Sequence, residues 1–410
     1  MCKVLVSRQA ILNVPNLRFP EFSGEWMSCQ LGKIASLSKG EGISKDQRSI
    51  NGNPCILYGE LYTTYSTEII DKVISKTNLP EKGLVKSKAN DVIIPASGET
   101  AIDISTARCV TRSDVFLGGD LNIIRLKGQD GKFFSYQLNG VRKKDIAKVA
   151  QGVSIVHLHG SDLATVQVNY PSIGEQQKIS GFLSLIDQRI AIQNRIIEDL
   201  KKLRTTLNNR FHNSFGEGVV TCFEELGKSY SGLSGKGAED FEKGYPFITY
   251  TNVFNHSFIS DEDMGYVRIK AEEHQNHVEH GDLLLTLSSE TPEEVGIGAV
   301  YLGNRKPLYL NSFCIGIHIN RKDIVLPTYL PYLVESKMFR KFIFPLAQGS
   351  TRYNLQKSDF EKKKIVLPTL EAQISITRIL DSITSKLSLE QEILTKLLMS
   401  KNALLSKMFI

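Results

Sequence analysis

One short polar segment near the end of the chain carries side chains suited to hydrogen-bond the edge of a nucleic-acid base. An arginine can present two donors to guanine, and asparagine or glutamine suits adenine. Gly349 permits a sharp turn that would turn these side chains toward one surface. The alternative is a plain turn whose polar residues cap neighbouring elements. The predicted DNA contacts are Gln348, Gly349, Ser350, Thr351, Arg352, Tyr353 and Asn354.

A matching segment lies 197 residues earlier, where it begins with the same glutamine and glycine and then differs. If the two segments contact different bases, their side chains should differ, so the difference favours base contacts over a shared structural role. Val153 lies within this segment but is not a predicted contact. The predicted contacts of the first segment are Gln151, Gly152, Ser154 and His157.

Two further groups of polar residues are weaker candidates for contacts with DNA. Ser97, with Gly98, and the pair Ser288 and Ser289 come just after matching apolar runs. Three basic residues belong to the first glycine-rich loop. Contacts with phosphates position a protein on DNA without specifying sequence, and this is the role we expect here. The three basic residues are Lys39, Lys45 and Arg48.

Catalytic chemistry finds little support in the sequence. It contains no G-x-x-x-x-G-K-[ST], G-x-S-x-G or H-E-x-x-H string, and the glycine-rich run at 296–303 has the wrong spacing for a dinucleotide loop. His274, His277 and His280 lie three apart and could recruit a metal, but neighbouring glutamates favour a solvated charged face. We expect no catalytic residues, no bound metal and no cofactor on this chain.

The positions of these residues follow from an internal repeat. Residues 150–187 align without a gap to residues 347–384, and upstream the correspondence is looser but keeps its order. Each copy has short apolar runs typical of strands, at 92–95, 122–126, 283–287 and 313–319, followed by helical spacing. The fold class is therefore α+β (mixed α/β), with two similar globular domains.

A long helix is predicted at the end of each copy, because apolar residues there recur at alternating steps of three and four. Ser172 with Glu175 forms a capping box for the first helix, whereas Thr369 opens the second with a weaker cap. The repeated seam favours two antiparallel helices in a coiled coil, although the same stripe could dock onto its own domain. The apolar seam positions are Leu183, Ile186, Ile190, Ile197, Leu200, Leu207 and Phe211, then Leu380, Ile383, Leu387, Leu394, Leu397, Leu404 and Met408.

The seam is interrupted by polar residues at matching places in both helices. Such residues cost stability but can fix register and partner number. They are Gln193 and Glu390, then Arg204 and Lys401. The predicted segments are a first domain over 1–170, a helix over 171–213, a second domain over 214–367 and a helix over 368–410.

Composition is that of an ordinary globular protein. The 410 residues are 41% hydrophobic and 23% charged, with a net charge of +6 that is compatible with a polyanionic partner. We find no apolar run long enough for a membrane span and no signal peptide, so we expect a cytoplasmic protein without a membrane partner. The six cysteines, including Cys2, are far apart and are expected to be reduced.

The repeated AQG turn, the following P-[ST]-x-x-x-Q string and the heptad helix ending in LNNRF or LLSKMF resemble the specificity subunits of type I restriction-modification enzymes. That resemblance implies two target recognition domains, each recognising half of a bipartite, asymmetric site in double-stranded DNA. It implies helices that set the spacing and dock two methyltransferase subunits. S-adenosylmethionine, ATP and magnesium would belong to those subunits and to the restriction subunits. The N-P-P-[YF] or D-P-P-[YF] tetrapeptide of adenine methyltransferases is absent here.

Two other hypotheses remain open from the sequence. The chain could be a coiled-coil scaffold that joins proteins without binding DNA, in which case salt would affect binding little. It could also be the specificity arm of a type II-like restriction-modification system, which neighbouring genes would distinguish.

Overall fold

The computed structural model describes residues 13–152, 154–214 and 217–410. Residues 1–12 (which include Cys2), Val153 and residues 215–216 therefore lie outside the described part. The chain divides into two compact units. The first unit comprises Met1–Asn194 and Glu392–Ile410, and the second comprises Arg195–Gln391. Each unit thus contains one globular domain with half of each long helix.

The core of the first unit is a five-stranded sheet in the order β2-β12-β8-β10-β5, in which only the β10–β5 pair is parallel. A second sheet has the order β3-β6-β4-β11-β7. The strands of the first sheet are β2 (Ala35–Lys39), β12 (Leu121–Leu126), β8 (Asp91–Pro95), β10 (Arg108–Val110) and β5 (Ile69–Ile70). Those of the second are β3 (Arg48–Ser49), β6 (Lys76–Thr77), β4 (Asn53–Ile56), β11 (Phe116–Leu117) and β7 (Val85–Lys86).

The second unit repeats this topology. Its main sheet has the order β16-β24-β20-β22-β18, again with one parallel pair at the edge, and its smaller sheet has the order β19-β17-β23. The strands are β16 (Gly227–Ser231), β24 (Cys314–Ile319), β20 (Leu283–Thr286), β22 (Gly298–Tyr301), β18 (Phe258–Ile259), β19 (Gly265–Val267), β17 (Phe241–Ile248) and β23 (Tyr309–Leu310). The apolar runs predicted as strands form most of β8, β12, β20 and β24, and β8 and β20 are buried along their whole length.

Short helices cover the sheets in both units. Two of them, at 330–335 and 337–343, are separated by Ser336, whose hydroxyl caps the later helix by accepting from the backbone amide of Phe339. The first unit has α1 (Leu31–Ile34), α2 (Glu60–Thr63), α3 (Ala101–Ile104), α4 (Gly131–Asn139), α5 (Lys143–Val149) and α6 (Gly160–Thr165). The second has α8 (Phe223–Leu226), α9 (Tyr250–Asn255), α10 (Leu330–Glu335), α11 (Lys337–Ile343) and α12 (Lys357–Lys362).

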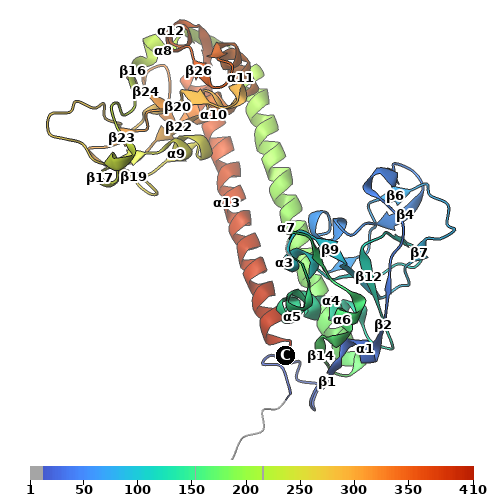
Figure 1. Ribbon diagram of the computed structural model, residues 1–410. Helices are drawn as coiled ribbons and strands as arrows, with labels where there is room; N and C mark the ends of the chain where they lie inside the picture. The colour runs from blue at the N-terminus through green and yellow to red at the C-terminus, as the bar shows by residue number, and fades with distance from the viewer. Residues whose placement is uncertain (1–12, 153, 215–216) are drawn as a thin grey trace, which may run out of the picture. The chain divides into compact units, whose positions relative to one another are not determined.

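The two long helices are uninterrupted: α7 spans Ile173–Asn213 and α13 spans Leu370–Lys407 (Figure 1). In the first unit, Leu183 of α7 belongs to the same core as Leu405 of α13. In the second unit, Leu207 of α7 shares a core with Leu380 of α13. The beginning of each helix is thus grouped with the end of the other, as in an antiparallel coiled coil.

Every seam position named above is buried or half-buried, while most residues between them are exposed. Two of the polar interruptions form ion pairs with acidic residues of the same unit. Arg204 pairs with Glu335 in the second unit at 2.9 Å. Lys401 pairs in the first unit with Glu68 at 2.6 Å and with Asp187 at 2.7 Å. These two cations therefore fasten each domain to a helix.

The first turn of each long helix is anchored by the same glutamine. The amide of Gln176 donates to the carbonyl of Pro171 at 2.9 Å, and that of Gln373 donates to Pro368 at 2.8 Å. The helices start at equivalent residues, 197 apart. Thr369 caps the second helix, since its hydroxyl accepts from the backbone amide of Ala372 at 3.4 Å.

The predicted capping box of α7 needs correction. Within the described residues, the Glu175 carboxylate accepts two hydrogen bonds from Arg18, both at 2.7 Å, and one from the Trp26 indole at 3.4 Å. A charge-assisted, two-pronged bond to arginine is stronger than a bond to a backbone amide, so the arginine takes both oxygens. No helix among the described residues is long and apolar enough to cross a membrane.

Candidate nucleic-acid interface

Two polar segments of the second unit, distant in sequence, meet in one small sheet of the order β21-β26-β25. The strands are β21 (Ser288–Ser289), β26 (Tyr353–Leu355) and β25 (Ala347–Gln348). Asn354 lies opposite Ser288 on one side and opposite Gln348 on the other, and Tyr353 lies opposite Ser289. The structure therefore brings the two groups of predicted residues of this copy together.

The first unit builds the same arrangement from equivalent positions. Strand β13 (Val156–His157) pairs with β9 (Ser97–Gly98), so His157 lies opposite Ser97. Gln151 and His157 exchange two backbone hydrogen bonds of 2.8 and 2.7 Å, which closes a hairpin. His157 and Asn354 are 197 residues apart, and so are Gln151 and Gln348. The ring of His157 also stacks on that of His159, with centroids 6.4 Å apart.

A glycine shapes each hairpin. Gly152 has φ +123° and Gly349 has φ +150°, a region that side chains rarely adopt. A Cβ on Gly152 would lie 2.1 Å from the carbonyl oxygen of Ile155, and one on Gly349 would lie 2.0 Å from that of Arg352. Any other residue would open the hairpin, so the glycines common to both copies are explained by geometry.

The hairpin tips share a backbone design but carry different chemistry. Ile155 of the first unit is 61% exposed. Its counterpart in the second unit, 197 residues on, is Arg352, whose guanidinium lies 5.2 Å from the centre of the exposed Phe313 ring. Ser154, Ser350 and Thr351 are exposed beside them. The same place thus presents an apolar group in one unit and a cation in the other.

Next to the second hairpin lies a pocket of about 370 Å³, which contains Ser288, Ser289 and Arg352. Its aromatic wall includes Tyr250 and Phe254, whose rings stack 5.9 Å apart. Burial raises the pKa of the Tyr250 phenol, so this group stays protonated at neutral pH and can donate a hydrogen bond. The complete lining is Tyr250, Phe254, Ser288, Ser289, Glu290, Glu294, Phe313 and Arg352.

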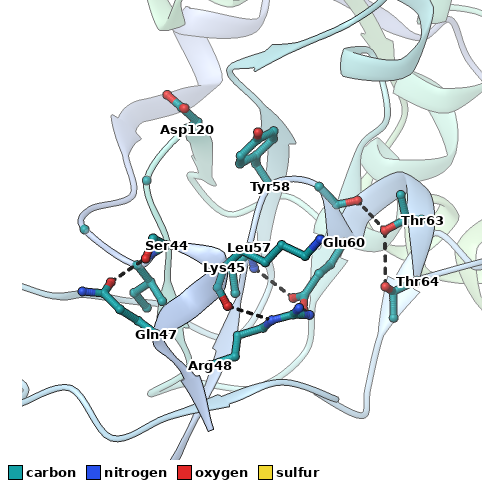
Figure 2. Close-up of a pocket in the computed structure, with 14 residues that line it drawn as sticks. Ser44, Lys45, Gln47, Arg48, Leu57, Tyr58, Glu60, Thr63, Thr64 and Asp120 are labelled. Atoms are coloured by element: carbon teal, nitrogen blue, oxygen red, sulfur yellow. Dashed lines mark hydrogen bonds and ion pairs between the residues drawn. The ribbon is translucent and has the colours of Figure 1, made fainter.

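A larger pocket of about 800 Å³ lies in the first unit, and its lining includes Lys45, Arg48 and Tyr58 (Figure 2). The Arg48 side chain donates to the carbonyl of Lys45 at 3.2 Å and lies 3.6 Å from the Glu60 carboxylate. Glu60 is buried and accepts the backbone amide of Leu57 at 3.0 Å. The arginine is therefore held in place, as a positioning contact with phosphate would require.

Lys39 lies apart from that basic pair. It lies opposite Asn122 in the main sheet, and it lines a separate pocket of about 380 Å³ with Asn122 and Ser161. The Asn122 amide donates to the carbonyl of Leu158, next to His157, at 2.8 Å. Lys39 is thus the last residue of strand β2 and not part of the glycine-rich loop in which it was predicted, whereas Lys45 and Arg48 line the larger pocket.

The histidine cluster forms neither a helix face nor a metal site in the described part of the chain. Residues 271–280 are irregular, His277 packs against the Tyr309 ring at 4.9 Å, and His280 lies 3.1 Å from the Gly303 carbonyl oxygen. No group of three metal-ligating side chains was found among the described residues.

Acidic residues of the interface were missed by sequence reasoning. Glu290 lines the pocket beside Arg352, and Glu99 follows the equivalent strand of the first unit. Both belong to a repeated string, Ser-Gly-Glu-Thr at 97–100 and Ser-Ser-Glu-Thr at 288–291. Extending the alignment of the two copies past Ser97 and Ser288 would have identified both glutamates.

Known proteins resemble the chain along nearly its full length. A family model described as the type I restriction modification DNA specificity domain matches residues 23–202 and 223–399. The specificity subunit of the type I restriction enzyme MjaVIII of Methanocaldococcus jannaschii is 22% identical, over 92% of this chain and 89% of its own.

Solved structures agree in fold. The S subunit of a type I restriction-modification system from M. genitalium gives a TM-score of 0.59 at 17% identity, covering 97% of this chain and 99% of its own. A chain from a structural study of complex assembly and conformational transition in the type I R-M system gives 0.58 at 16% identity, covering 94% and 97%.

Proposed function

Because the chain belongs to the type I restriction-modification DNA specificity family, we propose that each of its units recognises one half of a bipartite, asymmetric site in double-stranded DNA. One observation carries this proposal. The two units hold the same glycine-bent hairpin against the same serine-containing strand, yet differ in the exposed side chains, His157 against Asn354 and Ile155 against Arg352. A shared scaffold with different side chains suits two different half-sites.

The long helices would set the separation of the half-sites and dock the modification subunits. Both helices carry exposed apolar residues outside the seam, which a coiled coil alone does not require. Ile192 of α7 and Leu389 of α13 occupy the same place in the repeat, 197 residues apart. Two equivalent apolar patches favour two copies of one partner, so we propose two methyltransferase subunits.

The chemistry would belong to those partners. In this proposal the methyltransferase subunits bind S-adenosylmethionine and transfer the methyl group to adenine. Restriction subunits use ATP and magnesium. The chain itself supplies the DNA contacts and the scaffold, without a catalytic residue of its own.

The proposal is tested by producing the chain with its methyltransferase subunit and mapping adenine methylation on genomic DNA. We expect methylation at a site of two different half-sequences separated by a fixed number of unspecified bases. Methylation at a continuous palindrome, or none from an active preparation of both subunits, would contradict the proposal.

A domain exchange tests the division between units. Replacing residues 218–367 with the second domain of another family member should change one half-site and leave the other as it was. A change in both halves would show that the units do not act separately. The half-site that changes is then the one assigned to the second unit.

A further inference from the structure

We propose that Arg352 and Glu290 together select a G·C base pair within the half-site of the second unit. This inference rests on the proposed function and names the base chemistry that the site recognises. Both side chains line the same pocket beside the hairpin. One offers paired donors and the other offers paired acceptors, so they complement the two members of a single base pair.

The position and orientation of Arg352 suit hydrogen bonds to a base rather than a nonspecific electrostatic contact with phosphate. Its guanidinium is held over the Phe313 ring at 5.2 Å, a contact that restricts the plane of the group. Among the described residues, the Arg352 guanidinium contacts this ring and forms no ion pair. Its donors therefore remain available for the O6 and N7 atoms of guanine.

Glu290 supplies the complementary chemistry. It follows Ser289 directly, at the end of the strand that pairs with the hairpin, and it is exposed. A glutamate accepts a hydrogen bond from the N4 amino group of cytosine, whereas it would repel a phosphate. Unlike the buried Glu60 near Arg48, the exposed Glu290 carboxylate has no ion-pair partner among the described residues, so it remains available to a base.

The first unit provides an internal comparison. It keeps the glutamate as Glu99 and keeps the hairpin, but it has Ile155 in place of the arginine. Isoleucine has no donor for guanine and can make only apolar contact, such as with the methyl group of thymine. The single position at the hairpin tip therefore accounts for a difference in base preference between two similar domains.

The test is equilibrium binding by the complex of the full chain with its methyltransferase subunit. The probes are duplexes in which each base pair of the mapped site is changed in turn. For the unaltered complex, changing one G·C pair of the second half-site to A·T should weaken binding by about tenfold to a hundredfold. With Arg352→Gln that penalty should fall to about threefold or less, because glutamine favours adenine.

Two further variants separate base selection from general effects. Arg321→Gln removes an exposed arginine that pairs with Asp323 instead of lining the pocket, and it should leave every penalty as in the unaltered complex. Ile155→Arg should create a preference for guanine in the other half-site. The inference is overturned if the second half-site lacks a G·C pair, or if Arg352→Gln keeps the full penalty. If the unaltered complex shows no sequence preference at all, the proposed function itself fails.

Discussion

The ammonium group of Lys401 lies 2.7 Å from the carboxylate of Asp187, so the end of α13 is fastened to α7 inside the first unit. The same ammonium lies 2.6 Å from Glu68, which immediately precedes β5. The hydroxyl of Tyr136 donates to Asp187 at 2.6 Å. One largely buried ionic network therefore joins both long helices to the globular domain.

Removing this cation should destabilise the first unit strongly. In Lys401→Met the Glu68 and Asp187 carboxylates, both largely buried, would lose the cation that they share. Breaking a buried pair by removing one partner costs about 3–5 kcal/mol. The loss should appear in urea unfolding of the full chain.

The repeat supplies the matched control at Arg204, the residue equivalent to Lys401. The Arg204–Glu335 pair is more open, with side chains 24% and 30% exposed against 12% for Lys401. Arg204→Met should therefore cost only about 1 kcal/mol or less. Equal losses for the two variants would show that the network at Lys401 is not the stronger anchor.

The same network should give stability a defined dependence on pH. Burial raises the pKa of Glu68 above its ordinary 4.5, and the attraction of Lys401 opposes that rise without cancelling it. A carboxyl whose pKa is higher in the folded state takes up a proton on folding, so its contribution to stability falls as pH rises above 4.5. It becomes constant above the folded-state pKa.

Glu68→Gln removes that titration. Unfolding free energies measured in urea between about pH 4 and pH 7 should show the unaltered chain losing stability relative to the variant as pH rises. A relative gain with rising pH would mean that the pKa of Glu68 is lowered in the folded state, contrary to this account.

Local periodicity was sufficient to predict the long helices and the buried strands. A heptad seam is a pattern between residues three and four apart, and Leu183 and Leu380 needed no knowledge of distant residues to be placed on it. The pairing of Ser97 with His157 joins residues 60 positions apart. The sequence identified Ser97 and His157 as separate candidates, but it could not show that they are neighbours.

Long-range contacts also explain what the sequence analysis missed. Glu175 has the spacing of a capping residue, but Arg18, distant in sequence, binds its carboxylate. Lys39 and Lys45 were predicted in one loop yet line different pockets, because Lys39 belongs to strand β2 of the main sheet. Charge and loop membership alone do not distinguish these places.

The hairpin glycines provide a test confined to the interface. Gly349→Ala should force the hairpin open, since its Cβ would lie 2.0 Å from a carbonyl oxygen, and should reduce discrimination in the second half-site by tenfold or more. Gly152→Ala should do the same in the first half-site only. Binding of the complex to duplexes altered in one half-site at a time measures both effects.

Gly181 is the matched control, because it lies within α7 and nothing lies within 4 Å of a Cβ built there. Gly181→Ala should raise stability by up to about 1 kcal/mol and leave both half-sites unchanged. If Gly349→Ala kept full discrimination, the hairpin would not be part of the DNA contact.

Ile192 on α7 and Leu389 on α13, two equivalent exposed apolar residues, should determine how many methyltransferase subunits bind. Ile192 is 58% exposed and Leu389 is 50% exposed, so a glutamate at either place should change stability by less than about 0.5 kcal/mol. A charge in the centre of an apolar contact is costly to desolvate. Each single variant should therefore lose one bound methyltransferase subunit at concentrations that saturate the unaltered chain, and the double variant should lose both.

Light scattering of the purified complexes counts the bound subunits directly. Asn194→Glu is the control, because Asn194 is exposed two residues from Ile192 and so faces a different side of the helix. That variant should still bind two subunits. A double variant that also bound two at unchanged affinity would place the docking surface elsewhere, whereas loss of both from either single variant would show that the two sites are coupled.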